Sequence, residues 1–196
     1  MSERNLDLSV IVVVHNQVES LRLIVRSLLA QDFSGSYEVI VTDDGSFPEV
    51  FFAYQSEVSG SQLPTKYIWQ PHLHFRAATA RNNGIKVSRG KILLFLDGDL
   101  VPALDVLRKH VETHTSPKMI VAGNRKWRGE LSSDSQIPSR SIEAVLGFME
   151  EEFFVDEKSR ERERVERQRR KQWLTSPYPW RGCFSSNVSV DWSPAV

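Results

Sequence analysis

The chain has 196 residues, and its 25 Lys and Arg balance its 25 Asp and Glu, so the formal net charge is zero. This balance argues against a nucleic-acid-binding protein, which normally carries a basic excess, and the apolar runs at residues 10–14 and 92–96 are too short to span a membrane. The only cysteine, Cys183, allows no internal disulfide, and the first residues lack a signal-peptide layout. We therefore expect a cytoplasmic protein, with peripheral contact at the inner face of a membrane left open.

Strands and helices alternate along the first 122 residues. Apolar and β-branched runs predict strands at residues 10–14, 37–41, 66–69, 92–96 and 119–122. Helical spacing predicts a first helix that ends at about residue 31, with Asn16 as its N-cap and Glu19 completing a capping box. Further helices are predicted from about Pro48, over residues 76–87, and from Pro102 to about residue 115. This alternation predicts an α/β fold, a mostly parallel sheet flanked by helices.

The second part of the sequence differs in composition. Residues 156–171 contain 8 basic and 5 acidic side chains. They are interpreted as a solvated helix or a lid, within a charged segment of about residues 151–173. The alternative is a basic surface for anionic lipid or a phosphate-bearing substrate. One further strand is predicted at residues 187–190.

Two acidic clusters follow predicted strands, at the sheet edge where ligands bind in α/β proteins. Asp97 and Asp99 are two residues apart, so in extended chain they project to one side and could share a divalent cation, with Gly98 allowing close approach. Oxygen ligands favour Mg²⁺ or Mn²⁺ over Zn²⁺. The alternative is an ordinary turn before the next helix.

The second cluster is Asp43 and Asp44, followed by Gly45 and Ser46. Adjacent carboxylates repel each other, so hydrogen-bond donors must offset that cost. The donors could come from a nucleobase or from ribose hydroxyls. The alternative is a tight turn in which Ser46 caps the following helix.

Two histidine pairs have a spacing that could bind a metal. His72 and His74 share a side if the chain is extended, and His110 and His114 share a helical face. For His110 and His114 we favour an exposed helical surface, because no acidic or cysteine partner is evident in the sequence.

Four motifs in order carry a resemblance to a known family. They are residues 12–16 (VVVHN), 43–46 (DDGS), 80–84 (ARNNG) and 95–99 (FLDGD). Together they resemble the nucleotide-sugar-binding half of family 2 glycosyltransferases, which have the Rossmann-like GT-A fold, in the style of chondroitin polymerases and polypeptide N-acetylgalactosaminyltransferases. The resemblance covers roughly residues 8–125, and residues 181–190 look like a later segment of the family.

The resemblance implies a domain at residues 1–125 that binds the nucleotide sugar and, at residues 126–196, an incomplete acceptor-side half. It also implies a role for each motif. Val14 and Asn16 would line the nucleobase pocket, and Asp44 would bind the base or ribose, with Asp43 beside it. Arg81 and Asn82 would face the diphosphate or donor sugar, and Gly84 would pack its helix on the sheet. Asp97 would lie close to the ribose or sugar, and Asp99 would bind the metal, with Asp97 as a second ligand.

The implied activity is a metal-dependent transfer of sugar from a nucleotide sugar, UDP-sugar being preferred, to a glycan or other acceptor. The cofactor is Mn²⁺ or Mg²⁺, the reaction is inverting, and the setting is polysaccharide biosynthesis. Two alternatives stay open. One is a non-catalytic relic that binds nucleotide sugar, and the other is a phosphatase with Asp97 as nucleophile.

The general base is the point where the sequence departs from the family pattern. The family shows an acidic pair after the later strand, whereas here Asp191 alone follows Asn187 and is a weak candidate. We therefore expect a fragment of a longer enzyme or a degenerate member, and little transfer by residues 1–196 alone.

Overall fold

The computed structural model describes residues 5–116, 119–123, 141, 160–162, 164–165, 167–168 and 187–191. The chain divides into two compact units, Met1–Gly123 with Ser185–Val196, and Asn124–Phe184. The elements of the first unit are β1 (Leu6–Val14), α1 (Val18–Leu29), β2 (Tyr37–Asp43), α2 (Pro48–Val58), β3 (Thr65–Trp69), α3 (Ala77–Val87), β4 (Gly90–Asp97), α4 (Val106–Thr113), β5 (Ile120–Ala122) and β6 (Val188–Asp191). Among the described residues, no helix is long and apolar enough to cross a membrane.

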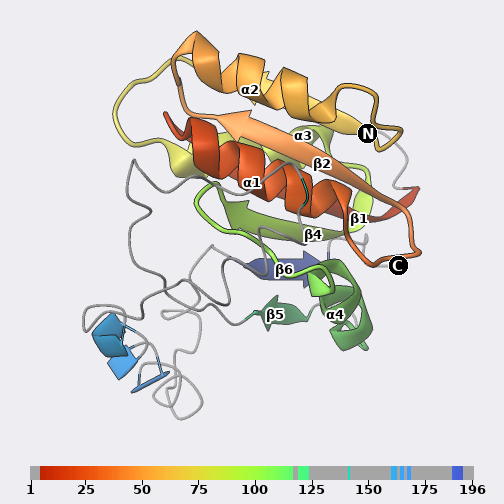
Figure 1. The fold of residues 1–196 in the computed structure, drawn as a ribbon. Coiled ribbons are helices and arrows are strands. Elements are labelled where there is room, and N and C mark those ends of the chain that lie inside the picture. Colours follow the sequence, from red (N-terminus) through yellow and green to blue (C-terminus); the bar gives the residue numbers. More distant parts are fainter. Residues whose placement is uncertain are drawn as a thin grey trace. The chain divides into compact units, whose positions relative to one another are not determined.

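The strands form one sheet in the order β3-β2-β1-β4-β6-β5 (Figure 1). β3, β2, β1 and β4 run parallel, while β6 is antiparallel to both β4 and β5. The predicted mostly parallel α/β sheet is therefore confirmed. β6, which the sequence division at residue 125 groups with the second half, joins the sheet of the first unit.

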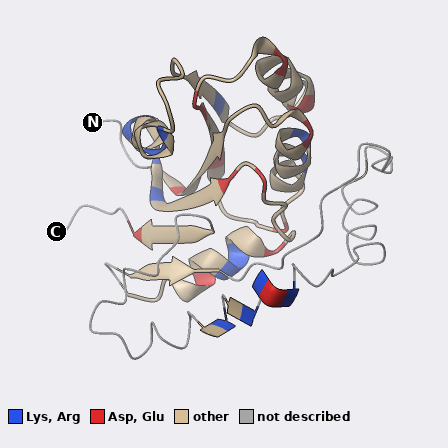
Figure 2. Ribbon diagram, turned by 90° about the vertical axis from the view of Figure 1, so that its left-hand side faces the viewer, with Lys and Arg blue, Asp and Glu red and all other residues tan. Residues whose placement is uncertain are grey.

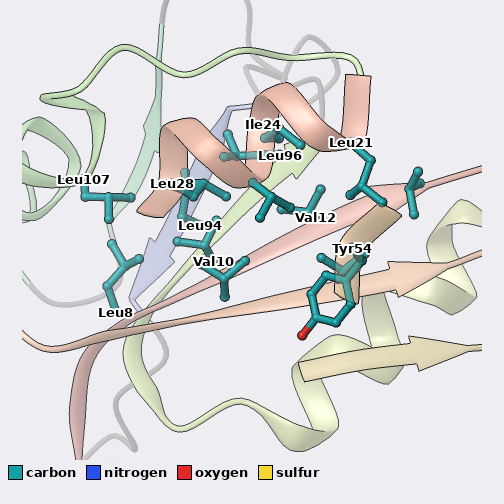
Figure 3. Close-up of a cluster of buried hydrophobic side chains, with 14 of the residues drawn as sticks. Leu8, Val10, Val12, Leu21, Ile24, Leu28, Tyr54, Leu94, Leu96 and Leu107 are labelled. Atoms are coloured by element: carbon teal, nitrogen blue, oxygen red, sulfur yellow. The ribbon is translucent and has the colours of Figure 1, made fainter. Parts of the chain in front are cut away.

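One face of the sheet packs against α1 and α2. Successive strand residues point to opposite faces, so alternate positions of β1, β2 and β4 line the core with α1, α2 and α4 (Figure 3). The fully or almost fully buried members include Leu8, Val10, Val12, Leu21, Ile24, Leu28, Val39, Val41, Leu94, Leu96 and Leu107. Because these strands are buried, they appear in the sequence as apolar runs, and this is why they could be predicted.

The opposite face is covered by α3, which contacts β1 and β2. At Gly84 an added Cβ would lie 2.7 Å from Ile11 Cγ2 and 3.1 Å from Thr42 Cγ2. A side chain there would push the helix off the sheet. The prediction that Gly84 allows α3 to pack closely is confirmed.

Two helix starts differ from the predictions. α1 begins at Val18 with Gln17 as N-cap and no side-chain capping bond, so the Asn16 capping box is wrong. α4 begins at Val106 and not at Pro102. The carbonyls of residues 102–104 are occupied by the end of α1: they accept hydrogen bonds from Ser27 Oγ, Gln31 Nε2 and the Asp32 N–H. Those contacts hold the segment against α1 as a loop.

In the second unit, residues 160–162, 164–165 and 167–168 are helical. Arg164 Nη2 lies 2.7 Å from Glu161 Oε1, three residues away, and both side chains are exposed. These described residues agree with the solvated helix predicted for the charged segment.

Candidate functional site

The predicted acidic clusters lie at one edge of the sheet. In the parallel register Val14 is opposite Asp43, and Val13 is opposite Asp97. The carboxyl ends of β2, β1 and β4 are therefore neighbours, as a ligand site of an α/β sheet requires. Acidic positions, drawn red in Figure 2, mark strand ends and the loops that follow them.

Asp43, the last residue of β2, is buried and bound within the fold. Its Oδ1 accepts hydrogen bonds from the Ser46 N–H at 2.8 Å and from Ser46 Oγ at 2.6 Å, and its Oδ2 accepts one from the Tyr67 hydroxyl. Burial, and then the bond to Asp43, raise the pKa of Tyr67, which keeps the phenol protonated as the donor. Ser46 is not the N-cap of α2, because Phe47 holds that position.

Asp44 has a separate set of partners. Its Oδ1 accepts from Gln70 Nε2 at 2.6 Å, and its Oδ2 accepts from the Arg76 N–H at 2.8 Å. Its own N–H donates to the Val14 carbonyl at 3.0 Å. Protein donors thus offset the repulsion between the adjacent carboxylates. Carboxylate lone pairs remain for the hydrogen-bond donors of a ligand, so the predicted contact with a base or ribose stays a prediction.

The sequence did not indicate the histidine stack above Asp44. The rings of His15 and His72 are parallel within 17°, with centroids 4.5 Å apart. Both Nδ1 atoms contact the Asp44 carbonyl oxygen, at 3.0 and 3.1 Å. This oxygen can only accept, so each ring donates its Nδ1–H to it. His74 has a left-handed φ of 62°, so the extended geometry assumed for His72 and His74 is not present.

Asn16 ties two loops of the site together. Its φ of 52° is left-handed, a region that Asn tolerates better than most residues. Its N–H donates to Ser46 Oγ at 2.8 Å, and its Oδ1 accepts from the Phe47 N–H at 3.0 Å. The side-chain oxygen is therefore engaged with the β2–α2 loop and cannot cap α1. Val14 is 1% exposed and belongs to the hydrophobic core.

Arg81 and Asp97 meet at the end of β4. Arg81 projects from α3, and its Nη2 lies 2.6 Å from Asp97 Oδ1. The Arg81 Nε is buried and has no hydrogen-bond partner in the part of the chain that the structure describes. Asn82, the next residue on α3, is exposed.

Asp99 lies in a turn, so the extended geometry assumed for Asp97 and Asp99 is wrong. β4 ends at Asp97, and Gly98 turns back toward β1, where its N–H donates to the Val13 carbonyl at 2.8 Å. An added Cβ at Gly98 would lie 2.7 Å from that same oxygen. Asp99 is exposed and makes no hydrogen bond or ion pair to any described residue.

The carboxylates at this edge suit a hard cation that is also bound by phosphate or water. Among the described residues, no group of three or more His, Cys, Asp or Glu is placed to hold a metal alone. Magnesium-like ions commonly use one or two carboxylates, with phosphates and waters completing the shell. Asp97 and Asp99 provide that kind of partial set.

Asp191 lies far along β6 from this edge. Because β6 is antiparallel to β4, Asp191 pairs with Ile92, while Val188 pairs with Phe95. Asp97 is five positions after Ile92, or about 17 Å along an extended strand. The register therefore argues against Asp191 as the general base.

His110 and His114 are not an exposed helical face, contrary to the prediction. His110 is 3% exposed; its Nδ1 lies 2.7 Å from Ser189 Oγ and its Nε2 lies 2.9 Å from Asn187 Oδ1. His114 Nε2 contacts the same Ser189 Oγ at 2.7 Å. Burial lowers the pKa of both imidazoles. These contacts join α4 to β6 and form a structural cluster.

Comparison with known proteins gives relatives that are named as glycosyltransferases. A Bacillus subtilis (strain 168) protein, the uncharacterized glycosyltransferase YfnE, is 30% identical over 120 residues, covering 61% of this chain and 30% of the relative. The chain thus spans less than a third of that relative.

Solved glycosyltransferases share the fold. The mannosyltransferase PcManGT from Pyrobaculum calidifontis, in complex with GDP-Man and Mn²⁺, aligns with a TM-score of 0.54 at 21% identity, over 61% of this chain and 36% of its own. S. aureus TarS 1–349, in complex with UDP-GlcNAc, aligns with a TM-score of 0.51 at 22% identity, over 65% and 37%. These likenesses confirm the predicted GT-A type of fold.

The match to a family covers almost the whole described sheet. Residues 9–191 match the model of glycosyl transferase family 2, from within β1 to the end of β6. This span holds all four motifs that carry the resemblance in the sequence, as well as the later segment. The chain belongs to glycosyltransferase family 2.

Proposed function

We propose that this chain binds a nucleotide sugar, with UDP-sugar as the preferred donor, and that the enzyme to which it belongs transfers the sugar to a glycan acceptor with inversion. The observation that carries the proposal is the arrangement of Arg81, Asp97 and Asp99 at the carboxyl edge of a family 2 sheet. The relatives' names and the ligands of the structural neighbours support a nucleotide-sugar donor.

Each side chain at the edge has a chemical task in this proposal. Asp44 and the His15–His72 stack lie at the ends of β1, β2 and β3, where they would hold the base and ribose. Arg81 would bind the diphosphate, because a guanidinium matches phosphate oxygens with parallel N–H donors. Asn16 would hold the loop after β1 against the β2–α2 loop, beside the nucleobase.

Asp97 and Asp99 would hold Mn²⁺ or Mg²⁺. A bound cation of this kind stabilises negative charge on a departing diphosphate as a Lewis acid. Arg81 adds positive charge on the same side and lowers the cost of bringing a diphosphate to two carboxylates. We assign no general base, since the register places Asp191 away from this edge.

Titration calorimetry tests the proposal with UDP and GDP, each with Mn²⁺ and with a chelator. We expect UDP to bind in Mn²⁺ and to bind at least about tenfold more weakly in chelator. Asp99→Asn should weaken Mn²⁺-dependent UDP binding by about 10- to 150-fold, the loss of one charged interaction. The matched control is Asp32→Asn, an exposed carboxylate with only a long contact to Arg108, which should not change UDP affinity.

The outcomes separate the remaining functions. Equal UDP affinity with and without chelator would remove the cation from the proposal, and absence of binding to either nucleotide would overturn it. Binding without turnover by the full-length gene product would favour a nucleotide-sugar-binding relic. The family match already favours a transferase over the phosphatase alternative.

A further inference from the structure

The Arg81–Asp97 contact occupies a carboxylate that the proposed cation also needs. The N···O distance of 2.6 Å is short for a charge-assisted hydrogen bond. The two side chains are 19% and 37% exposed, so solvent weakens the pair only in part. Asp99, two residues away, has no such partner among the described residues.

The guanidinium of Arg81 is incompletely satisfied in this arrangement. It carries five N–H donors, and the buried Nε has no hydrogen-bond partner in the described part of the chain. An unpaired buried donor costs free energy. A diphosphate offers several oxygen acceptors to the same fork, and would therefore compete well with one carboxylate oxygen.

The position of Arg81 decides whether Asp97 attracts a cation. While Arg81 lies on Asp97, the carboxylate is neutralised and a cation near it meets a like charge. Once Arg81 turns to phosphate, the full charge of Asp97 becomes available beside Asp99.

We propose that Arg81 is an exchangeable counter-ion, held by Asp97 when the nucleotide is absent and by the diphosphate when it is bound. The exchange couples the two ligands: nucleotide binding prepares Asp97 for the cation, and by thermodynamic reciprocity the cation releases Arg81 for the nucleotide. This inference rests on the proposed function. It assigns Arg81 as the residue that links diphosphate binding to cation binding.

A double-mutant cycle on UDP binding in chelator tests the exchange. Asp97→Asn should release Arg81 and raise metal-free UDP affinity by about fivefold or more, a typical size for such coupling. With Arg81→Gln already present, the same change should raise affinity by no more than about twofold, because only the general loss of negative charge remains.

Asp99→Asn is the matched control, because it removes the same charge two residues away without touching the ion pair. Its effect on metal-free UDP affinity should be small and equal in both backgrounds. If Asp97→Asn and Asp99→Asn raise affinity equally, or if the effect of Asp97→Asn is the same with Arg81→Gln, the exchange is overturned. The comparison of Asp97→Asn with Asp99→Asn needs no change at Arg81, so it stands even where Arg81→Gln does not fold.

The same titrations separate this inference from the proposed function. UDP binding by the parent in Mn²⁺, together with an additive cycle, would leave the proposed function intact and reject the exchange alone. No UDP binding by the parent in Mn²⁺ would reject both. Thermal unfolding of each variant confirms that it is folded before its affinity is used.

Discussion

Two acidic side chains at opposite edges of the sheet, Glu38 and Asp99, differ in burial and in pairing. At the amino edge, Glu38 is fully buried and accepts hydrogen bonds from Ser9 Oγ at 2.8 Å, Lys66 Nζ at 2.8 Å and the Arg89 N–H at 2.6 Å. Burial alone would raise the pKa of Glu38, but these hydrogen bonds lower it overall. At the carboxyl edge, Asp99 is exposed and has no partner among the described residues.

The difference separates acids that stabilise the fold from acids that are available to a ligand. A buried carboxylate with every oxygen paired is part of the structure, and its removal leaves partners without charge compensation. A carboxylate left to solvent contributes little to folding, so its position at a ligand-binding edge needs another explanation. The following predictions separate the two classes, starting with the largest effect.

Glu38→Gln should lower the free energy of unfolding by about 2–3 kcal/mol, because it removes the charge of a fully buried carboxylate that accepts hydrogen bonds from half-exposed Lys66 and from Arg89. Urea denaturation at neutral pH measures this change. The matched control is Glu112→Gln on α4, an exposed acid 3.5 Å from Arg108, which should cost less than about 0.5 kcal/mol. A small effect at Glu38 would show that the two edges do not differ in this way.

Asp44→Ala should combine both behaviours, because Asp44 is buried and lies at the carboxyl edge. Losing its bonds to Gln70 and the Arg76 N–H should destabilise the fold. Losing a charged partner for the base or ribose should weaken UDP binding by about 1.5–3 kcal/mol, with the Mn²⁺ requirement retained. Calorimetry on the folded variant measures the binding loss. If the Asp44→Ala variant binds UDP as tightly as the parent, the nucleobase does not contact Asp44.

Acidification should weaken the fold modestly through His110 and His114. Their pKa values lie below the ordinary 6.5 when folded, chiefly through burial. Below pH 6.5 the unfolded chain therefore binds more protons than the folded chain, and stability falls as the pH falls. Urea midpoints between about pH 5 and 8 measure the slope.

Two substitutions test whether the histidines cause this dependence of stability on pH. His110→Gln should flatten it, whereas His74→Asn, at an exposed position with φ of 62°, should leave it unchanged. A slope that His110→Gln leaves unchanged would have to come from His114 or from other groups.

Local sequence patterns were sufficient for most of the fold and for placing the acidic clusters at one edge of the sheet. The runs at residues 10–14 and 92–96 are apolar throughout because both faces of β1 and β4 are covered, and this burial is what the pattern records. The same logic located the acidic clusters at strand ends, and at Gly84 a close approach of α3 to Ile11 follows from the missing Cβ. These features depend on neighbours in the chain or on burial alone.

Tertiary structure decided how each polar side chain is used. Asn16 reads as a helix cap, but its oxygen is taken by the Phe47 N–H, 31 residues away. His110 reads as exposed, but its partner Ser189 is 79 residues away on an antiparallel strand. That strand direction also places Asp191 level with Ile92. A hydrogen bond depends on the position of both partners within a few tenths of an ångström, and local periodicity specifies only one of them.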